Sequence, residues 1–160
     1  MGKSSLTILL LVGAIAIVHT EVISFENCNE SVKCTVHEVR VDPCPESTQN
    51  KPCVMVRGSN ATISFDYTPE FNAEAAVAKA FWTQTAADLP FVGLDNEGCK
   101  YTPCPIAEGQ RQSYSYNLTI MKTYPLRTYK VKWELMNEAN EMCCFIIDVS
   151  IKSKKGRTRN

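Results

Sequence analysis

This 160-residue chain contains eight cysteines, the residue type here with the widest range of possible chemical roles. Thiols can bind zinc, act as nucleophiles or pair as disulfides, and an even number behind a secretory signal favours disulfides in an oxidising compartment. Cys44 and Cys53 flank a polar loop, and the simplest pairing closes that loop locally, because little chain entropy is then lost. Cys99 and Cys104, if bonded, tie off a second small loop.

Adjacent Cys143 and Cys144 pose a separate question. A bond between neighbours would be strained. In a strand, adjacent side chains point to opposite faces, so each of the two should find a different partner. Cys28 and Cys34 are left to pair with them, in an order that this reasoning leaves open.

His37 is the single histidine after residue 20, and it offers little for catalysis. A triad also needs a nucleophile and an orienting acid, and no G-x-S-x-G motif is present. A histidine on a strand surface beside Glu38 is the simpler interpretation. Asp95 and Glu97 lie next to a glycine, where turn chemistry explains them. The sequence therefore predicts no enzyme, no metal site and no cofactor.

The first 20 residues have the pattern of a cleaved signal peptide: Lys3, then an uncharged apolar run, then small or polar residues. The alternative is a membrane anchor, but the run is at the short end of the about 20 residues that a span needs. We expect a domain over 21–152, a basic disordered tail over 153–160, and secretion or delivery to the lysosomal lumen. N-glycosylation sequons at Asn29, Asn60 and Asn117 fit this route.

Charge is distributed unevenly along the chain. After residue 20 there are 16 basic and 17 acidic residues, and five of the basic ones lie in the last nine positions, which leaves 11 basic against 17 acidic in the body. An acidic body argues against nucleic acid as a partner. The basic tail could contact an anionic membrane surface, although a solvated end is the commoner explanation of such a run.

Alternation of apolar and polar residues predicts short strands separated by turn signals, which indicates an all-β sandwich. The segment 70–82 is ambiguous, because its alanines allow a helix, but its context favours a strand. The clipped loop 89–105 aims Phe91 at a strand-built core, which suggests a lined cavity. The expected strands are Thr35–Val41, Val54–Val56, Ala61–Tyr67, Glu70–Trp82, Ser113–Ile120, Tyr129–Leu135 and Cys144–Ile151.

A run of motifs across the chain resembles the MD-2-related lipid-recognition (ML) domain family, in particular the branch of Niemann–Pick disease type C protein 2 and its arthropod-like members. The match spans nearly the whole chain after residue 20, in order and with near-family spacing. The motifs are Phe25-x-x-Cys28, Glu38-Val39-x-Val41-x-Pro43-Cys44-Pro45, Pro52-Cys53, Arg57-Gly58, Pro90-Phe91, Gly98-Cys99, Cys104-Pro105-Ile106, Tyr114-x-Tyr116, Tyr124-Pro125, Trp133-x-Leu135 and Cys144-Phe145.

The resemblance implies an immunoglobulin-like β-sandwich of two antiparallel sheets, about seven strands, with an apolar cavity between the sheets and no catalysis. It implies the disulfides Cys28–Cys144, Cys44–Cys53 and Cys99–Cys104. Cys34 and Cys143 depart from the family pattern, and we expect them to form a fourth bond. The alternative pairs Cys28 with Cys143 and Cys34 with Cys144.

The family's sterol-contact positions fall on Phe91, Ile120 and Tyr124, with Tyr124 as the expected gate. Tyr116 and Trp133 are added only because they lie on the apolar face of their strands, and ordinary core is the alternative for both. Phe65 completes the candidate set. In place of the family's proline-rich rim the chain has Val92-Gly93-Leu94, which should be more pliable and admit long-chain lipids.

The function expected from this resemblance is a secreted, monomeric carrier that binds and transfers a sterol, a long-chain fatty acid or another hydrophobic semiochemical. Its partners would be that ligand and a membrane surface or lipid-accepting receptor. The alternative function is innate-immune recognition of microbial lipids that are presented to a receptor.

Overall fold

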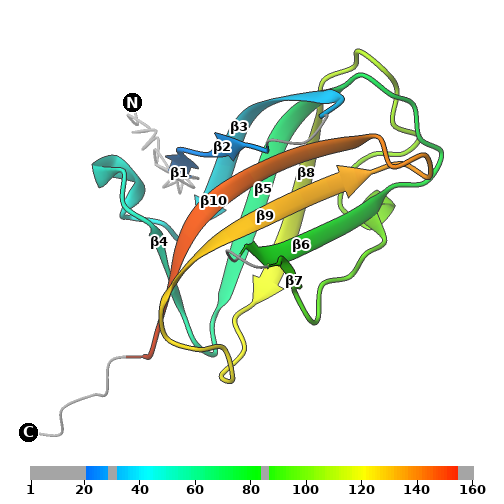
Figure 1. Ribbon diagram of the computed structural model, residues 1–160. Coiled ribbons are helices and arrows are strands. Elements are labelled where there is room, and N and C mark those ends of the chain that lie inside the picture. Colours follow the sequence, from blue (N-terminus) through cyan, green and yellow to red (C-terminus); the bar gives the residue numbers. More distant parts are fainter. Residues whose placement is uncertain (1–20, 29–31, 84–86, 155–160) are drawn as a thin grey trace, which may run out of the picture.

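Two β-sheets packed face to face contain nearly all the secondary structure of residues 21–28, 32–83 and 87–154, the residues that the computed structural model describes (Figure 1). The four-stranded sheet has the order β1 (Glu21–Ile23), β3 (Cys34–Asp42), β5 (Asn60–Pro69) and β8 (Gln112–Thr119). The six-stranded sheet has the path β2 (Glu26–Asn27), β10 (Met142–Lys152), β9 (Thr128–Met136), β6 (Val77–Thr83) and β7 (Leu89–Pro90), with β4 (Cys53–Val56) also paired to β10. The predicted all-β sandwich is confirmed.

Strand pairing is antiparallel throughout these sheets except for one pair. β4 runs parallel to β10, with Cys53 opposite Val149 and Val56 opposite Lys152. Two short 3₁₀ turns, η1 (Ser47–Gln49) and η2 (Gly98–Lys100), lie in the loops beside the disulfide-linked cysteines. The described residues contain ten strands rather than about seven, and the three additional ones, β1, β2 and β7, are only two or three residues long.

The segment 70–82 differs from the expected strand in its first half. Only β6, from Val77 onward, is a strand. Before it, Ala73 exchanges backbone hydrogen bonds with Ile106, and the carbonyl of Ala76 accepts from Gly98. The backbone of residues 73–76 therefore pairs with the loop that follows β7 instead of with a sheet neighbour.

Alternating side chains build the interior, as the sequence predicts. In β5 the residues Ala61, Ile63, Phe65 and Tyr67 are buried, while those between them are half-exposed. β8 buries Tyr114, Tyr116 and Leu118 in the same way. The largest fully buried side chains are aromatic and come from both sheets: Trp133, Tyr67, Tyr114, Phe65 and Phe145.

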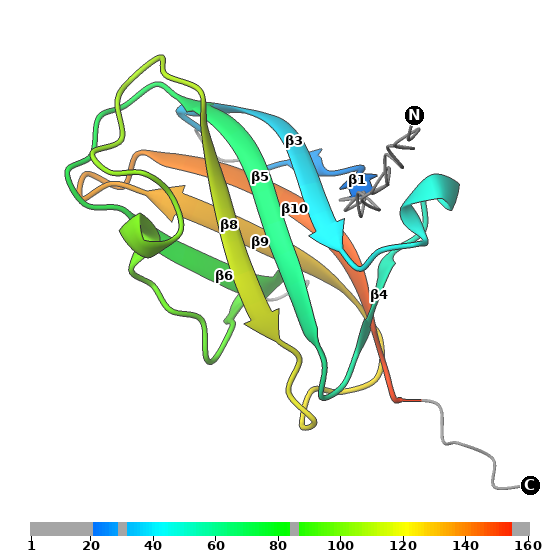
Figure 2. The ribbon, with the colours of Figure 1, turned by 180° about the vertical axis from the view of Figure 1, so that it is seen from behind.

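Four disulfides cross-link the fold, in the pairing that the family resemblance implies together with the Cys34–Cys143 bond. Cys34–Cys143 joins the start of β3 to β10, and Cys44–Cys53 joins the loop after β3 to β4, so both connect the two sheets. Cys28–Cys144 ties the end of β2 to β10. These three bonds lie on the side of the sandwich where β3 faces β10 and β4 (Figure 2).

Several expectations concern residues outside the described part of the chain. They are the signal peptide (1–20), the sequon at Asn29 and most of the basic tail (155–160). Asn60 and Asn117, the other two sequon residues, are both exposed on the outer face of the four-stranded sheet. Within the described residues, no helix has the length and apolar character to cross a membrane.

Candidate functional site

An apolar cavity lies between the two sheets. Its lining residues come from the end of the sandwich where β4 turns into β5 and where β8 ends; Figure 1 shows these strand ends. Its wall is drawn from both sheets and from the loops at this end. Its volume is about 10 Å³, close to the least space that holds one water molecule. The lining residues are Met55, Ile63, Trp82, Phe91, Leu118, Ile120, Tyr124, Val131, Trp133, Val149 and Ile151.

Four of the six residues predicted to bind a ligand line this cavity: Phe91, Ile120, Tyr124 and Trp133. Phe91 and Ile120 follow directly after β7 and β8, and Trp133 lies in the middle of β9. Three of these side chains are buried, whereas Tyr124 is half-buried. The structure therefore brings together residues that are up to 42 positions apart in the sequence.

Tyr116 and Phe65 are not among the lining residues, although both are buried. The hydroxyl of Tyr116 accepts a hydrogen bond from the backbone N–H of Asp95, at 3.2 Å. The ring of Phe65 packs against Tyr114 and Phe145, with centroids 5.0 and 4.9 Å away. Both side chains thus lie in the aromatic interior farther along the sandwich, and their role as ligand contacts remains a prediction.

Trp82 is a lining residue that the sequence analysis did not single out. In the structure Ala78 and Ala80 of β6 are buried, and Trp82 lies on their side of the strand. Phe81 faces outward, where the ammonium group of Lys132 lies 5.0 Å from its ring centroid. Small alanines opposite large rings were the available signal, since Ala80 is the sheet partner of Trp133.

Three aromatic rings close the cavity toward solvent, and we call Trp82, Phe91 and Tyr124 the ring gate. Their centroids are 4.7 Å (Trp82–Phe91), 5.7 Å (Trp82–Tyr124) and 5.3 Å (Phe91–Tyr124) apart. The hydroxyl of Tyr124 donates to the carbonyl oxygen of Val92, at 3.3 Å. This bond is long for an O–H donor, so it is easily broken.

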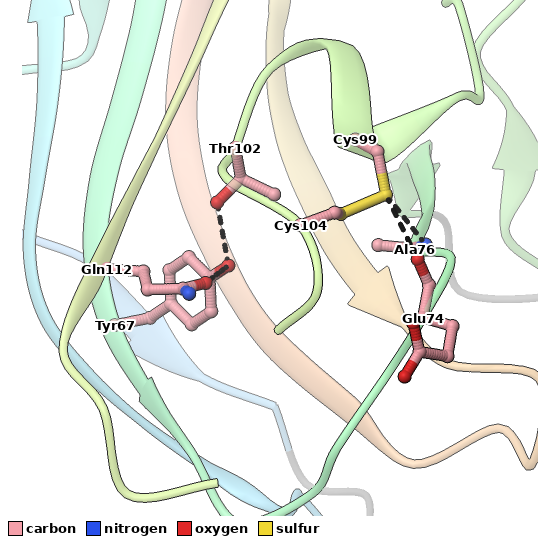
Figure 3. Close-up of a disulfide and its surroundings, with 7 residues drawn as sticks. All are labelled: Tyr67, Glu74, Ala76, Cys99, Thr102, Cys104 and Gln112. Carbon is pink, nitrogen blue, oxygen red and sulfur yellow. Dashed lines mark hydrogen bonds between the residues drawn. A yellow bond between two sulfur atoms is a disulfide. The ribbon is translucent and has the colours of Figure 1, made fainter. Parts of the chain in front are cut away.

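The Cys99–Cys104 disulfide holds the loop that supplies Phe91 (Figure 3). The backbone N–H of Ala76 donates to the sulfur of Cys99, at 3.3 Å. Gly98 approaches the same segment so closely that a Cβ there would lie 2.8 Å from the carbonyl oxygen of Ala76, which explains the glycine. The loop is therefore anchored against the residues that lead into β6.

A second anchor fastens this loop to the four-stranded sheet. The hydroxyl of Tyr67 on β5 shares a 2.8 Å hydrogen bond with the hydroxyl of Thr102 and donates to the side chain of Gln112 at 3.0 Å (Figure 3). The clipped loop thus contacts both sheets. Phe91 is positioned by a rigid connection, and its backbone N–H also donates to Ala80 of β6 at 2.8 Å.

The electrostatics of the cavity are those of an apolar site. Tyr124 is the only titratable residue among the lining residues, and burial raises its pKa. The indole Nε1 of Trp133 is buried and has no hydrogen-bond partner. No lining residue is a lysine, arginine, histidine, carboxylate, serine or cysteine, so the wall is suited to enclosing an apolar molecule.

His37 is exposed on β3 and is not among the residues that line the cavity. Its Nε2 is 2.7 Å from the hydroxyl of Thr68 on β5, the neighbouring strand. Among the described residues, no group of three or more His, Cys, Asp or Glu side chains could hold a metal ion.

The size of the cavity limits what it can hold in this conformation. Pockets for drug-sized ligands measure about 300–1,000 Å³, whereas this one measures about 10 Å³. The open inter-sheet space expected from the sequence is thus nearly closed by the ring gate and the neighbouring aliphatic side chains. A long-chain ligand can enter only if the ring gate moves and the two sheets separate at this end.

Comparisons with known proteins place these features in a wider group. The family model described as ML domain matches residues 22–151. An "MD-2-related lipid-recognition protein" of Manduca sexta is 38% identical over 133 residues, which cover 80% of this chain and 84% of the relative. The "Ecdysteroid-regulated 16 kDa protein" of the same species is 30% identical over 79% of this chain and 87% of the relative.

A solved structure shows the same fold. The crystal structure of a Niemann–Pick type C2 protein from Japanese carpenter ant superposes with a TM-score of 0.72, at 24% sequence identity, over 81% of this chain and all of that chain.

Proposed function

Because this chain belongs to the ML domain family, we propose that it binds one sterol or long-chain lipid between its two sheets and transfers it between membranes or proteins. The observation that supports this most is the apolar cavity between the sheets, whose gate is made of rings instead of a covalent closure. The 38% identical relative that is named a lipid-recognition protein supports the same conclusion.

The energy for opening the gate comes from burying the ligand itself. Removing apolar carbon from water yields roughly 0.8 kcal/mol per CH₂, so a chain of about 16 carbons gives on the order of 12 kcal/mol before ordering costs. The ring gate is held by one long hydrogen bond and by ring contacts, which are worth about 1 kcal/mol each. The gain therefore exceeds the cost of breaking these contacts.

The surface around the gate supports exchange of the ligand at an anionic membrane. Three segments meet there through backbone hydrogen bonds: Arg57 to Lys152 at 2.9 Å, Gly58 to Ile120 at 2.7 Å, and Ile151 to Arg127 at 2.9 Å. The segments 56–59, 120–128 and 151–154 carry five basic residues and no acidic one. We call this surface the basic rim.

Apolar side chains project from the same end. Val92 is 75% exposed, Leu126 50% and Met121 38%. A basic surface with protruding apolar side chains matches anionic headgroups above acyl chains, because the cations attract the headgroups while the apolar groups enter the interface. The ligand could then leave the cavity without crossing water.

Secretion and N-glycosylation complete the proposal. Four disulfides and no free cysteine among the described residues support an oxidising compartment. The exposed Asn60 and Asn117 are open to glycosylation, and the first 20 residues supply the signal for the secretory route.

Displacement of a fluorescent sterol and of a fluorescent fatty acid from the purified protein tests the proposed function. We expect saturable binding of at least one of them, weakened at least tenfold by Phe91→Ala. Phe145→Leu is the matched control, because Phe145 is a buried ring outside the cavity lining, so it should lower stability without a comparable loss of affinity. If neither probe binds saturably, the proposed function is wrong.

Presentation of a microbial lipid to a receptor is the second candidate, favoured by the lipid-recognition name of the 38% identical relative. Incubation with lipids extracted from bacterial envelopes, followed by mass spectrometry of the protein-bound fraction, separates the two. Preferential retention of envelope lipids over sterols and host fatty acids would favour recognition over transport.

A further inference from the structure

The indole N–H of Trp133 is the unusual polar group beside the cavity. Trp133 is 1% exposed, lines the cavity, and its Nε1 has no hydrogen-bond partner. Burying a donor without a partner is costly, and buried tryptophans usually find one. An unpaired donor on a residue that lines an apolar cavity is therefore a feature that a ligand can complete once the cavity opens.

The neighbouring rings do not supply the missing acceptor. Trp133 packs against Tyr114 and Tyr116 of the opposite sheet, with centroids 6.0 and 5.9 Å away and the planes inclined at 65° and 55°. Contacts of an N–H group with an aromatic face are weak compared with a bond to oxygen. The hydroxyl of Tyr116 is engaged by Asp95. Tyr114 also has a buried hydroxyl without a partner, so two unpaired polar groups occupy adjacent rings between the sheets.

Charge decides which kind of acceptor fits beside Trp133. The cavity lining contains no Lys, Arg or His. A carboxylate buried there would lose its hydration without gaining a counter-ion, which is strongly unfavourable. The cations of the basic rim lie at the mouth, on exposed residues such as Lys122 and Arg127. A fatty acid would therefore keep its carboxylate outside and leave Trp133 unpaired.

We propose that Trp133 is a specificity-determining residue whose indole N–H donates a hydrogen bond to an uncharged oxygen at the buried end of the ligand. The ligand class is a neutral long-chain lipid with an alcohol, aldehyde, ketone or ester oxygen that enters first. This inference rests on the proposed function, since it needs a lipid in the cavity, and it names which lipids the site prefers.

A thermodynamic cycle tests the inference. The affinities of 1-hexadecanol and hexadecane are measured by displacement of N-phenyl-1-naphthylamine from the wild type and from Trp133→Phe, which keeps an aromatic ring but removes the donor. We expect the Kd of hexadecanol to rise about fivefold to tenfold more than the Kd of hexadecane. An equal change for both ligands would overturn the inference, because it would show only a change in cavity shape.

Trp82→Phe is the matched control. Trp82 is the other tryptophan of the chain and also lines the cavity, but it belongs to the ring gate. This variant should change the affinities of both ligands by the same factor. A selective loss of hexadecanol affinity in Trp82→Phe, with none in Trp133→Phe, would place the specificity at the gate and overturn the assignment to Trp133.

A measurement on the wild type makes the test independent of how the variants fold. In protein labelled with ¹⁵N at tryptophan, the two indole N–H signals are assigned with Trp82→Phe. Hexadecanol should move the Trp133 proton signal downfield, as a new hydrogen bond does, and hexadecane should not. If hexadecanol binds and the Trp133 signal behaves as it does with hexadecane, the inference is wrong while the proposed lipid binding stands. If no lipid probe of any class binds, the proposed function itself fails.

Discussion

Tyr124 makes the polar contact of the ring gate, through the 3.3 Å hydrogen bond from its hydroxyl to Val92. The residue lies in the loop after β8 and precedes Pro125, and its ring meets both Trp82 and Phe91 edge-on. Val92 lies beside Gly93, whose φ of +97° suits glycine and whose missing Cβ leaves room for Met121. The gate therefore joins two loops through one weak bond and one close contact at a glycine.

Removing that bond should accelerate exchange of the ligand. In Tyr124→Phe the ring stays but the link to Val92 is lost, so we expect association and dissociation rates of a fluorescent lipid to rise severalfold, with a smaller change in Kd. Stopped-flow fluorescence measures both rates. Tyr101→Phe is the control, because it also removes a hydroxyl that donates a hydrogen bond to a loop, to the carboxylate of Asp95 at 3.0 Å, but on a residue outside the cavity lining and the ring gate. Unchanged rates in Tyr124→Phe would show that the gate opens elsewhere.

At the level of single residues, the resemblance to a family identified more of the site than periodicity did. Phe91, Ile120 and Tyr124 came from family positions, and all three line the cavity. The alternation of side chains along strands correctly placed Trp133 in the cavity lining. It also suggested Tyr116, which does not line the cavity, and it missed Trp82, which does. Alternation says which residues share a face of a strand, whereas position along the strand decides which of them reach a cavity at one end.

Asp66 connects the strands of the four-stranded sheet on its outer face. Its carboxylate accepts from Arg40 of β3 at 2.7 Å, from Ser113 of β8 at 2.7 Å, and from Arg111 at 3.0 Å. The Arg40 guanidinium is the main cause that holds the pKa of Asp66 well below its usual range. The side chains of Asp66 and Arg40 are only 17% and 18% exposed, so solvent screens this pair less than a typical surface pair.

The contribution of Asp66 to stability should depend on pH in a defined direction. Since its pKa is lower in the folded protein than the value of about 4 in an unfolded chain, the unfolded state takes up the proton first as the pH falls. Asp66→Asn should therefore lower the free energy of unfolding by about 2 kcal/mol at pH 7 and pH 5, and this difference should shrink below about pH 4. Urea unfolding at these pH values measures it.

Glu38→Gln is the control for this prediction. Glu38 also pairs with Arg40, at 3.0 Å, but it lacks the contact with β8. Its loss should cost less than that of Asp66. A constant difference between wild type and Asp66→Asn from pH 7 down to pH 3 would show that the ion pair does not have the role described.

The elements were predictable where alternation was regular and less so where loops replaced sheet partners. The bounds of the strands β3, β5, β8, β9 and β10 differ from the predicted ones by at most a few residues. β1, β2 and β7 are too short to have a period of their own and exist because a neighbouring strand offers unpaired backbone groups. The first half of 70–82 was predicted as a strand but is not one, because its backbone partner is the loop around Ile106 and not a strand of a sheet.

On the scale of the whole molecule, two disulfides act on nearly the same part of the chain. Cys28–Cys144 and Cys34–Cys143 span 116 and 109 residues. Once one of them is formed, the other closes a ring of only about seven residues, six from Cys28 to Cys34 and one between the adjacent cysteines, so it adds less to the loss of unfolded-state entropy.

The two bonds should consequently be non-additive. Replacing either pair by alanine should cost about 2 kcal/mol, whereas replacing both should cost about 7 kcal/mol, because the long loop is then open. Urea unfolding of the two pairwise variants and of the variant lacking all four cysteines measures this. Additive costs would mean that native-state contacts, and not the entropy of the unfolded chain, dominate.

The family, the sandwich and its cross-links were accessible from the sequence because motifs and cysteines occur along the whole chain, and the ML domain match over 22–151 confirms the family. The near closure of the cavity was not accessible. It depends on how Trp82, Phe91 and Tyr124 pack together, and packing across a gap of this kind has no signature in strand periodicity.

The disulfides that join the two sheets lie on one side of the sandwich. Cys34–Cys143 and Cys44–Cys53 join the two sheets beside β3, β4 and β10. Cys28–Cys144 fastens β2 to β10 within the six-stranded sheet, and Cys99–Cys104 closes a loop. The opposite side of the sandwich, where β6 and β8 lie, has no disulfide between the sheets among the described residues, and the ring gate lies there. Amide protons of β8 and β6 should accordingly exchange with solvent faster than those of β3 and β10. The two sheets should separate on this side by a distance that depends on the length of the ligand.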